Sequence, residues 1–133
     1  IKAIEPKSGQ DTWGEPIAVC CIEGGDYFVA DKSEGALRRC NAQGETIAVL
    51  DKAGMDVGLL YYLHHDKRFG LFASDYLNKR IWLLDEMLKP IYVYDCPGKR
   101  LGESGKITAV STFGDQLFAV DSDLHRIQVF KIQ

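Results

Sequence analysis

Three aspartates recur at nearly even spacing in this chain of 133 residues, and each follows a short apolar run. The runs and the aspartates that end them are Phe28–Asp31, Phe72–Asp75 and Phe118–Asp121. A carboxylate at the end of a strand can bind calcium or a substrate, or it can accept backbone N–H groups and fix the following turn. Turn fixing is the commoner role for a repeated aspartate. We therefore expect Asp31, Asp75 and Asp121 to be structural residues.

The three histidines do not make a metal-binding pattern. His64 and His65 are adjacent in an expected hairpin turn and should point apart, while His125 is expected on the opposite face of the fold. A single imidazole at His125 more often braces neighbouring strands than binds a metal. A catalytic metal needs several converging ligands, and the chain has no Gly-x-Ser-x-Gly, His-Glu-x-x-His or phosphate-loop motif. We expect no catalytic residue, no metal and no cofactor.

Composition restricts the classes of partner and the compartment. The formal net charge is −3 and the pI is about 5.6, which argues against the dominant basic surface of strong nucleic-acid binders. No apolar run approaches the ~18 residues that a membrane helix needs, so no membrane partner is expected. The four cysteines show no Cys-x-x-Cys spacing. Reduced thiols and a cytoplasmic location are therefore favoured.

Each aspartate occupies the same place in a series of short strands. An apolar strand begins six residues after each one, at Leu37, Ile81 and Ile127. Another strand begins fourteen residues before each one, and a fourth follows the first two, at Ile47–Leu50 and Ile91–Tyr94. A repeat of about 40–45 residues with four short strands is typical of a β-propeller blade. Such blades stack because one small sheet cannot bury both of its own faces.

The predicted fold is therefore all-β and consists of one domain over residues 1–133. We expect three four-stranded antiparallel blades at about 14–50, 57–94 and 105–133. Propellers have about four to eight blades, so three blades are too few to close a ring.

One segment identifies a family resemblance. Asp121–Phe130 closely resembles the most diagnostic segment of NHL-repeat propellers, which carries an Asn-His-Arg-Ile-Gln-Val-Phe-like strand after an aspartate and a polar turn. Asp75–Trp82 is similar without the histidine, and Asp31–Arg38 also looks like the related YWTD repeat. Gly14–Pro16 resembles the Gly-x-Pro lead-in of an NHL blade. The resemblance implies a six-bladed ring, of which this chain is half.

The two ends of the chain interrupt the repeat. Ile1–Ile4 reads as an outermost strand without a blade, because Ile1 and Ala3 match Ile47 and Val49, and the third blade stops before its fourth strand. We expect Ile1, Ala3 and Ile4 to complete the third blade, in the same chain or in a second copy. The second case predicts a head-to-tail homodimer that closes a six-bladed ring. Excision from a longer parent is the other interpretation, and the two are compatible.

In a propeller, the connectors between blades and the turns between second and third strands lie on one side, which we call the connector face. The leading functional prediction is a non-enzymatic recognition or scaffold module that binds a protein or peptide there. The alternative is single-stranded RNA, which basic and aromatic side chains can hold and which some NHL domains bind. A hydrolase or lyase is a third class, since some NHL-like propellers carry metal sites. The expected ligand-binding residues are Lys32, Tyr76, Asn78, Lys79, Arg80, Lys99, Arg100, His125 and Arg126.

Overall fold

The computed structural model of the chain describes residues 1–5, 13–32, 35–51, 56–95 and 106–132. These residues form eleven strands and no helix, which confirms the all-β prediction. A helix long and apolar enough to cross a membrane is accordingly missing from the described ranges. The strands are β1 (Pro16–Cys21), β2 (Tyr27–Asp31), β3 (Gly35–Cys40), β4 (Thr46–Asp51), β5 (Leu60–Asp66), β6 (Gly70–Asp75), β7 (Arg80–Leu84), β8 (Pro90–Asp95), β9 (Ile107–Phe113), β10 (Gln116–Asp121) and β11 (Arg126–Lys131).

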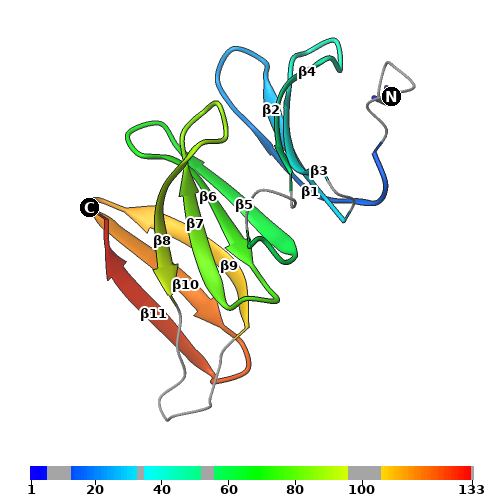
Figure 1. Cartoon of the computed structure of the whole chain (residues 1–133). Coiled ribbons are helices and arrows are strands. Elements are labelled where there is room, and N and C mark those ends of the chain that lie inside the picture. The colour runs from blue at the N-terminus through cyan, green and yellow to red at the C-terminus, as the bar shows by residue number, and fades with distance from the viewer. Residues whose placement is uncertain (6–12, 33–34, 52–55, 96–105, 133) are drawn as a thin grey trace.

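The strands make three antiparallel sheets that follow one another along the chain (Figure 1). The first sheet has the order β1-β2-β3-β4, the second β5-β6-β7-β8 and the third β9-β10-β11. Within each sheet, strands that follow one another in the sequence are thus paired, as short hairpin turns require. The β1–β2 turn uses Gly24 and Gly25, both at φ 98°, a conformation that glycine adopts without steric cost.

The second sheet is packed between the other two (Figure 1). Its first strand β5 contacts β1 on one side and β9 on the other, so the first strands of the three sheets are neighbours. Every residue of β6 is buried, because both of its faces are covered. The apolar cluster between the first and second sheets includes Phe28, Leu37, Leu60, Leu71 and Trp82. The cluster between the second and third sheets includes Phe72, Ile81, Leu83, Leu117 and Phe130.

Residues 1–5 form no strand in the structure, which differs from the strand expected at Ile1–Ile4. Cγ2 of Ile4 lies 3.2 Å from the position that a Cβ on Gly44 would take, so Ile4 packs at the β3–β4 turn of the first sheet. Figure 1 shows the N-terminus beside the first sheet and the C-terminus at the third sheet, at opposite ends of the molecule. Ile1, Ala3 and Ile4 therefore do not complete the third sheet within one chain. Their pairing with a second copy stays a prediction.

Sheet packing predicts that two phenylalanines differ greatly in how much their substitution lowers the free energy of unfolding. Phe72 is fully buried between the second and third sheets, whereas Phe113 is 77% exposed at the end of β9. Phe72→Ala should lower the free energy of unfolding by about 3–5 kcal/mol, because it leaves a cavity in the core. Phe113→Ala should change it by less than about 0.5 kcal/mol. Urea unfolding followed by tryptophan fluorescence measures both, and equal effects would contradict this packing.

Candidate functional site

The connector face is held together by one repeated backbone contact. The residue after each aspartate donates its amide to the segment that leads into the first strand of the same sheet. The three bonds are Lys32 N to Glu15 O at 3.1 Å, Tyr76 N to Leu59 O at 2.8 Å and Ser122 N to Lys106 O at 3.0 Å. The turn after the second strand and the chain entering the sheet therefore lie side by side at one end of all three sheets.

Asp75 joins these two segments a second time through its side chain. Its carboxylate is fully buried. Oδ2 accepts the backbone N–H of Gly58 at 3.0 Å and the indole N–H of Trp82 at 3.2 Å. The amide of Asn78 donates to Oδ1 at 3.2 Å, and its side-chain nitrogen donates to Oδ2 at 3.1 Å. Position 58 requires glycine, since a Cβ there would lie 2.7 Å from Oδ1 of Asp75.

Asp121 makes the equivalent contacts in the third sheet. Its Oδ1 accepts the backbone amides of Lys106 and Leu124, both at 3.3 Å. Its Oδ2 accepts the Arg126 guanidinium and the Gln128 amide, both at 3.0 Å. Burial acts to raise the pKa of Asp121, but the hydrogen bonds from Arg126, Leu124, Gln128 and Lys106 outweigh it and hold the pKa below its usual value.

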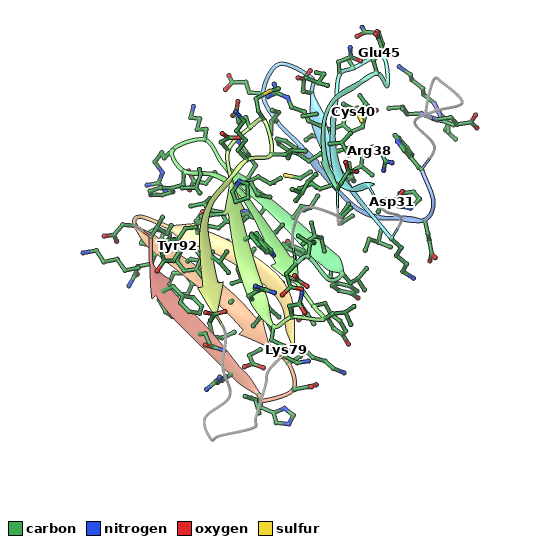
Figure 2. The ribbon with its side chains drawn as sticks, in the orientation of Figure 1. Asp31, Arg38, Cys40, Glu45, Lys79 and Tyr92 are labelled. Carbon is green, nitrogen blue, oxygen red and sulfur yellow. The ribbon has the colours of Figure 1, made fainter. Side chains whose placement is uncertain are left out.

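Asp31 makes a comparable set of contacts in the first sheet. Its Oδ1 accepts the backbone amides of Gly14 and Glu15, both at 3.2 Å. Arg38 lies seven residues further on, where the other sheets carry Trp82 and Gln128, and its guanidinium is 3.9 Å from Oδ2 of Asp31 (Figure 2). In all three sheets the carboxylate thus binds the connector, and in the second and third sheets it also binds the turn that follows it.

Most described cations of the predicted surface lie beside carboxylates. Nζ of Lys32 is 2.9 Å from Glu15, and Arg80 is 2.8 Å from Asp56. The remaining pairs are Arg126 with Asp121 at 3.0 Å and Lys106 with Asp123 at 3.9 Å. Lys99 and Arg100, also expected on this surface, lie outside the described residues. The described cations therefore do not add up to a continuous basic patch.

The polar residues predicted for the β6–β7 and β10–β11 turns differ in their surroundings. Asn78 is occupied by Asp75 and by the backbone oxygen of Asp56, at 3.0 Å from its side-chain nitrogen. Lys79 and His125 take equivalent left-handed positions at φ 56° and 51°, four residues after their aspartates. Lys79 lies at the connector end of the second sheet (Figure 2). His125 is exposed.

Two tyrosines meet at the junction of the second and third sheets. The rings of Tyr61 and Tyr76 have centroids 5.3 Å apart, and Tyr61 is 47% exposed. Nζ of Lys106 lies 5.4 Å from the centroid of the Tyr76 ring, and its hydrogen bond to Tyr76 raises the pKa of Lys106. Leu77, next in the turn, is 60% exposed. We call Tyr61, Tyr76, Leu77 and Lys106 the tyrosine cluster.

Sequence reasoning included Tyr76 but missed Tyr61 and Leu77 as surface residues. Tyr61 was expected only as part of the first strand of its blade. The available signal was the pair Tyr61-Tyr62, because neighbouring strand residues point to opposite faces and two tyrosines are bulky for two buried positions.

The two adjacent histidines point to different neighbours on the side opposite the connector face. β5 extends through His64 and His65 to Asp66, so both lie in the strand and not in the expected turn. Nε2 of His64 is 2.9 Å from the Thr112 hydroxyl, which in turn donates to Asp66 at 2.9 Å. His65 instead pairs with Glu86 at 3.2 Å.

The contacts of Thr112 differ from those of a nucleophilic triad. Its single hydroxyl proton is donated to Asp66, so Thr112 accepts from His64 and is not deprotonated by it. Within the described ranges, no three His, Cys, Asp or Glu side chains are grouped closely enough to hold a metal ion. The arrangement joins the second sheet to the third.

No protein-family model and no curated protein matches this chain.

The aspartate contacts predict that substitution of Asp75 lowers the free energy of unfolding far more than substitution of an exposed aspartate. Asp75→Asn places an N–H donor against the donors of Gly58, Asn78 and Trp82. It should lower the free energy of unfolding by about 2–3 kcal/mol. Asp123→Asn is the matched control, since Asp123 is 45% exposed, and it should cost less than about 0.5 kcal/mol. Denaturant unfolding measures both, and similar losses would contradict the structural role of Asp75.

His64 predicts an acid-sensitive contact between the second and third sheets. Burial lowers the pKa of His64 below its ordinary value of 6.5, against the pull of Asp66. The folded state therefore favours neutral imidazole, so this contribution is complete above pH 6.5 and is lost as pH falls through 6.5 toward the lower folded value. His64→Gln keeps a donor for Thr112 but does not titrate. Its unfolding midpoint should fall less than that of the unmodified protein between about pH 7.5 and about pH 5; identical slopes would contradict this.

Proposed function

We propose that the three sheets are successive blades of an NHL-like β-propeller, and that the chain is a non-enzymatic recognition module. The support for the blades is their order along the chain, the contact between their first strands and the buried aspartate repeated in each. Radially stacked four-stranded sheets are the repeating unit of propellers. The third sheet, with three strands, is an incomplete blade in this proposal.

The proposed partner is a protein or peptide segment, and the tyrosine cluster is the observation that carries this proposal. Large aromatic side chains with a polar tip are enriched where proteins bind peptides and other proteins, because they bury much apolar area at a small entropic cost. Tyr61 and Tyr76 lean against each other, which restricts their rings before any partner arrives. Leu77 is a further exposed apolar side chain next to Tyr76 in the turn, and Lys106 adds one positive charge beside the Tyr76 ring.

The chemistry of the cluster indicates the kind of segment it would bind. An apolar or aromatic side chain fits against the two rings and Leu77. A carboxylate nearby fits Lys106, whose distance of 3.9 Å from Asp123 leaves room for a closer acidic partner. The proposed ligand is therefore a segment with a large apolar residue next to an acidic one.

Single-stranded RNA fits the same surface less well. Base stacking on Tyr76 beside Lys106 is the one arrangement that favours RNA. Phosphate binding needs several available cations, however, and Lys32, Arg80 and Arg126 lie within 3.0 Å of carboxylates. The cytoplasmic location expected from the sequence stays a prediction.

The test is to select binders from a random peptide library and to measure their affinity for tyrosine variants. Tyr61→Ala and Tyr76→Ala should each weaken binding about tenfold or more, the loss of about 1.4 kcal/mol expected at an aromatic anchor. Tyr92→Ala is the matched control. Tyr92 is 46% exposed and its ring also contacts a tyrosine ring, that of Tyr94, with the centroids 4.7 Å apart. It lies on β8, away from the connector end marked by Lys79 (Figure 2).

Salt separates the two kinds of ligand. Peptide binding anchored by aromatic rings should change little with added salt, whereas affinity for polyuridylate RNA would fall steeply. Selected peptides that bind the Tyr61 and Tyr76 variants as well as the unmodified protein would overturn the proposal. Tight, salt-sensitive RNA binding lost in Tyr76→Ala would establish the alternative.

A further inference from the structure

The first and third sheets each leave one face uncovered. The face of a sheet that packs on the next sheet is called its leading face, and the face that packs on the preceding sheet its trailing face. Leu37 and Ile81 lie on the leading faces of the first and second sheets, while Leu63 and Val110 lie on the trailing faces of the second and third. The trailing face of the first sheet and the leading face of the third have no sheet against them in the described structure.

The uncovered trailing face carries a residue that is buried in the other two sheets. Val19, Leu63 and Val110 share one position, because each pairs with the residue two places before the aspartate of its sheet. Leu63 is 7% exposed and Val110 is 4% exposed, whereas Val19 is 64% exposed. Beside Val19 lies an apolar cavity of about 390 Å³, whose other lining residues include Ile4, Trp13, Tyr27 and Val29.

The uncovered leading face shows the same contrast. Leu37, Ile81 and Ile127 share one position, each pairing with the residue just before its aspartate. Leu37 and Ile81 are fully buried, and Ile127 is 57% exposed. Phe118, Val120 and Val129 lie around Ile127 on the same face, and Val129 is 50% exposed. At these positions both uncovered faces therefore expose apolar residues of the kind that the two internal interfaces bury.

We propose that a second copy of this chain covers both faces, with the leading face of each third sheet packed on the trailing face of the partner's first sheet. Each internal interface joins one leading face to one trailing face, and the two uncovered faces are one of each kind, so the contact between copies repeats the contact within a copy. Two such head-to-tail contacts close on themselves when the rotation is right. The resulting six sheets fall within the range of about four to eight blades in known propellers.

The edge of the third sheet supports the same partner. β11 has no outer neighbour among the described strands, whereas β3 and β7 are paired with β4 and β8. Residues 1–5 lie against the first sheet, which in the proposed dimer stands next to the partner's third sheet. An unpaired strand edge readily accepts an extended segment, so residues 1–4 of one copy are in place to pair with β11 of the other.

This inference rests on the propeller architecture proposed above but not on the tyrosine cluster. The variants that test it leave Tyr61 and Tyr76 unchanged, so dimer formation and peptide binding can fail separately. Val19→Glu charges only the uncovered trailing face, and Ile127→Glu charges only the uncovered leading face. Ile91→Glu is the matched control, because Ile91 is 54% exposed on β8 of the second sheet and belongs to neither uncovered face.

Light scattering on a size-exclusion column, at several concentrations, measures the molar mass. The unmodified protein and Ile91→Glu should have twice the 14.9 kDa mass of one chain. Val19→Glu and Ile127→Glu should each shift to one chain mass, with unchanged circular dichroism since both positions are exposed in the single chain. An equal mixture of these two variants should regain twice the chain mass, because one of the two interfaces then joins an unmodified leading face to an unmodified trailing face.

Three results would overturn the proposal. The first is an unmodified protein with one chain mass at every concentration, which would mean that other segments or proteins cover these faces. The second is a dimer lost in only one of the two variants, which indicates pairing of like faces. The third is a mass that grows with concentration beyond two chains, which indicates open assemblies instead of a closed pair.

Discussion

The buried carboxylate at the end of the second strand is the contact on which the connector face depends. In the second and third sheets it ties two segments that are far apart in sequence, the turn that follows it and the chain that enters the sheet, and in the first sheet Asp31 binds the entering chain. Asp75 reaches back to Gly58, and Asp121 reaches back to Lys106. A buried charge is costly unless hydrogen bonds satisfy it. Asp75 and Asp121 each accept two backbone amides and two side-chain N–H donors, one of which lies seven residues further along the chain. The β6–β7 and β10–β11 turns are therefore held in position by hydrogen bonds to these carboxylates.

The middle sheet holds the three sheets of the chain together, because it packs against a neighbour on each of its faces. Its two faces are covered by different neighbours, so Phe72 and Leu71 are both fully buried on opposite faces of β6. The outer sheets have one covered face each. Small sheets gain most of their stability from such face-to-face burial, because a single sheet in water exposes one apolar face. Two polar contacts also join neighbouring sheets. His64 bonds to Thr112 between the second and third sheets, and Arg39 donates to the backbone oxygen of Glu86 at 3.0 Å between the first and second.

The connector face has buried carboxylates beneath it and exposed side chains on its surface. Glu15, Asp56 and Asp121 lie within 3.0 Å of Lys32, Arg80 and Arg126, so the described cations do not form a continuous basic patch. Among the exposed residues of this face are two large apolar or aromatic side chains, Tyr61 and Leu77. Binding residues of repeat proteins often sit on turns that a rigid scaffold positions. The tyrosine cluster has this arrangement, since Tyr76 and Leu77 follow Asp75 directly.

The sequence by itself determined the local features of this protein. Strand positions follow from alternating apolar residues, and the turns follow from glycine, asparagine and aspartate, all of which act over a few residues. The repeat of 44 and 46 residues also placed the three aspartates at equivalent positions. Only the tertiary structure decided the rest, because it depends on packing between distant segments. Arg80 pairs with Asp56, which lies 24 residues earlier in the chain. The Tyr61 ring, near the start of β5, contacts the Tyr76 ring, just after the end of β6. Ile4 packs beside Gly44 and not beside β11, because in a single chain the first sheet offers the nearest apolar surface.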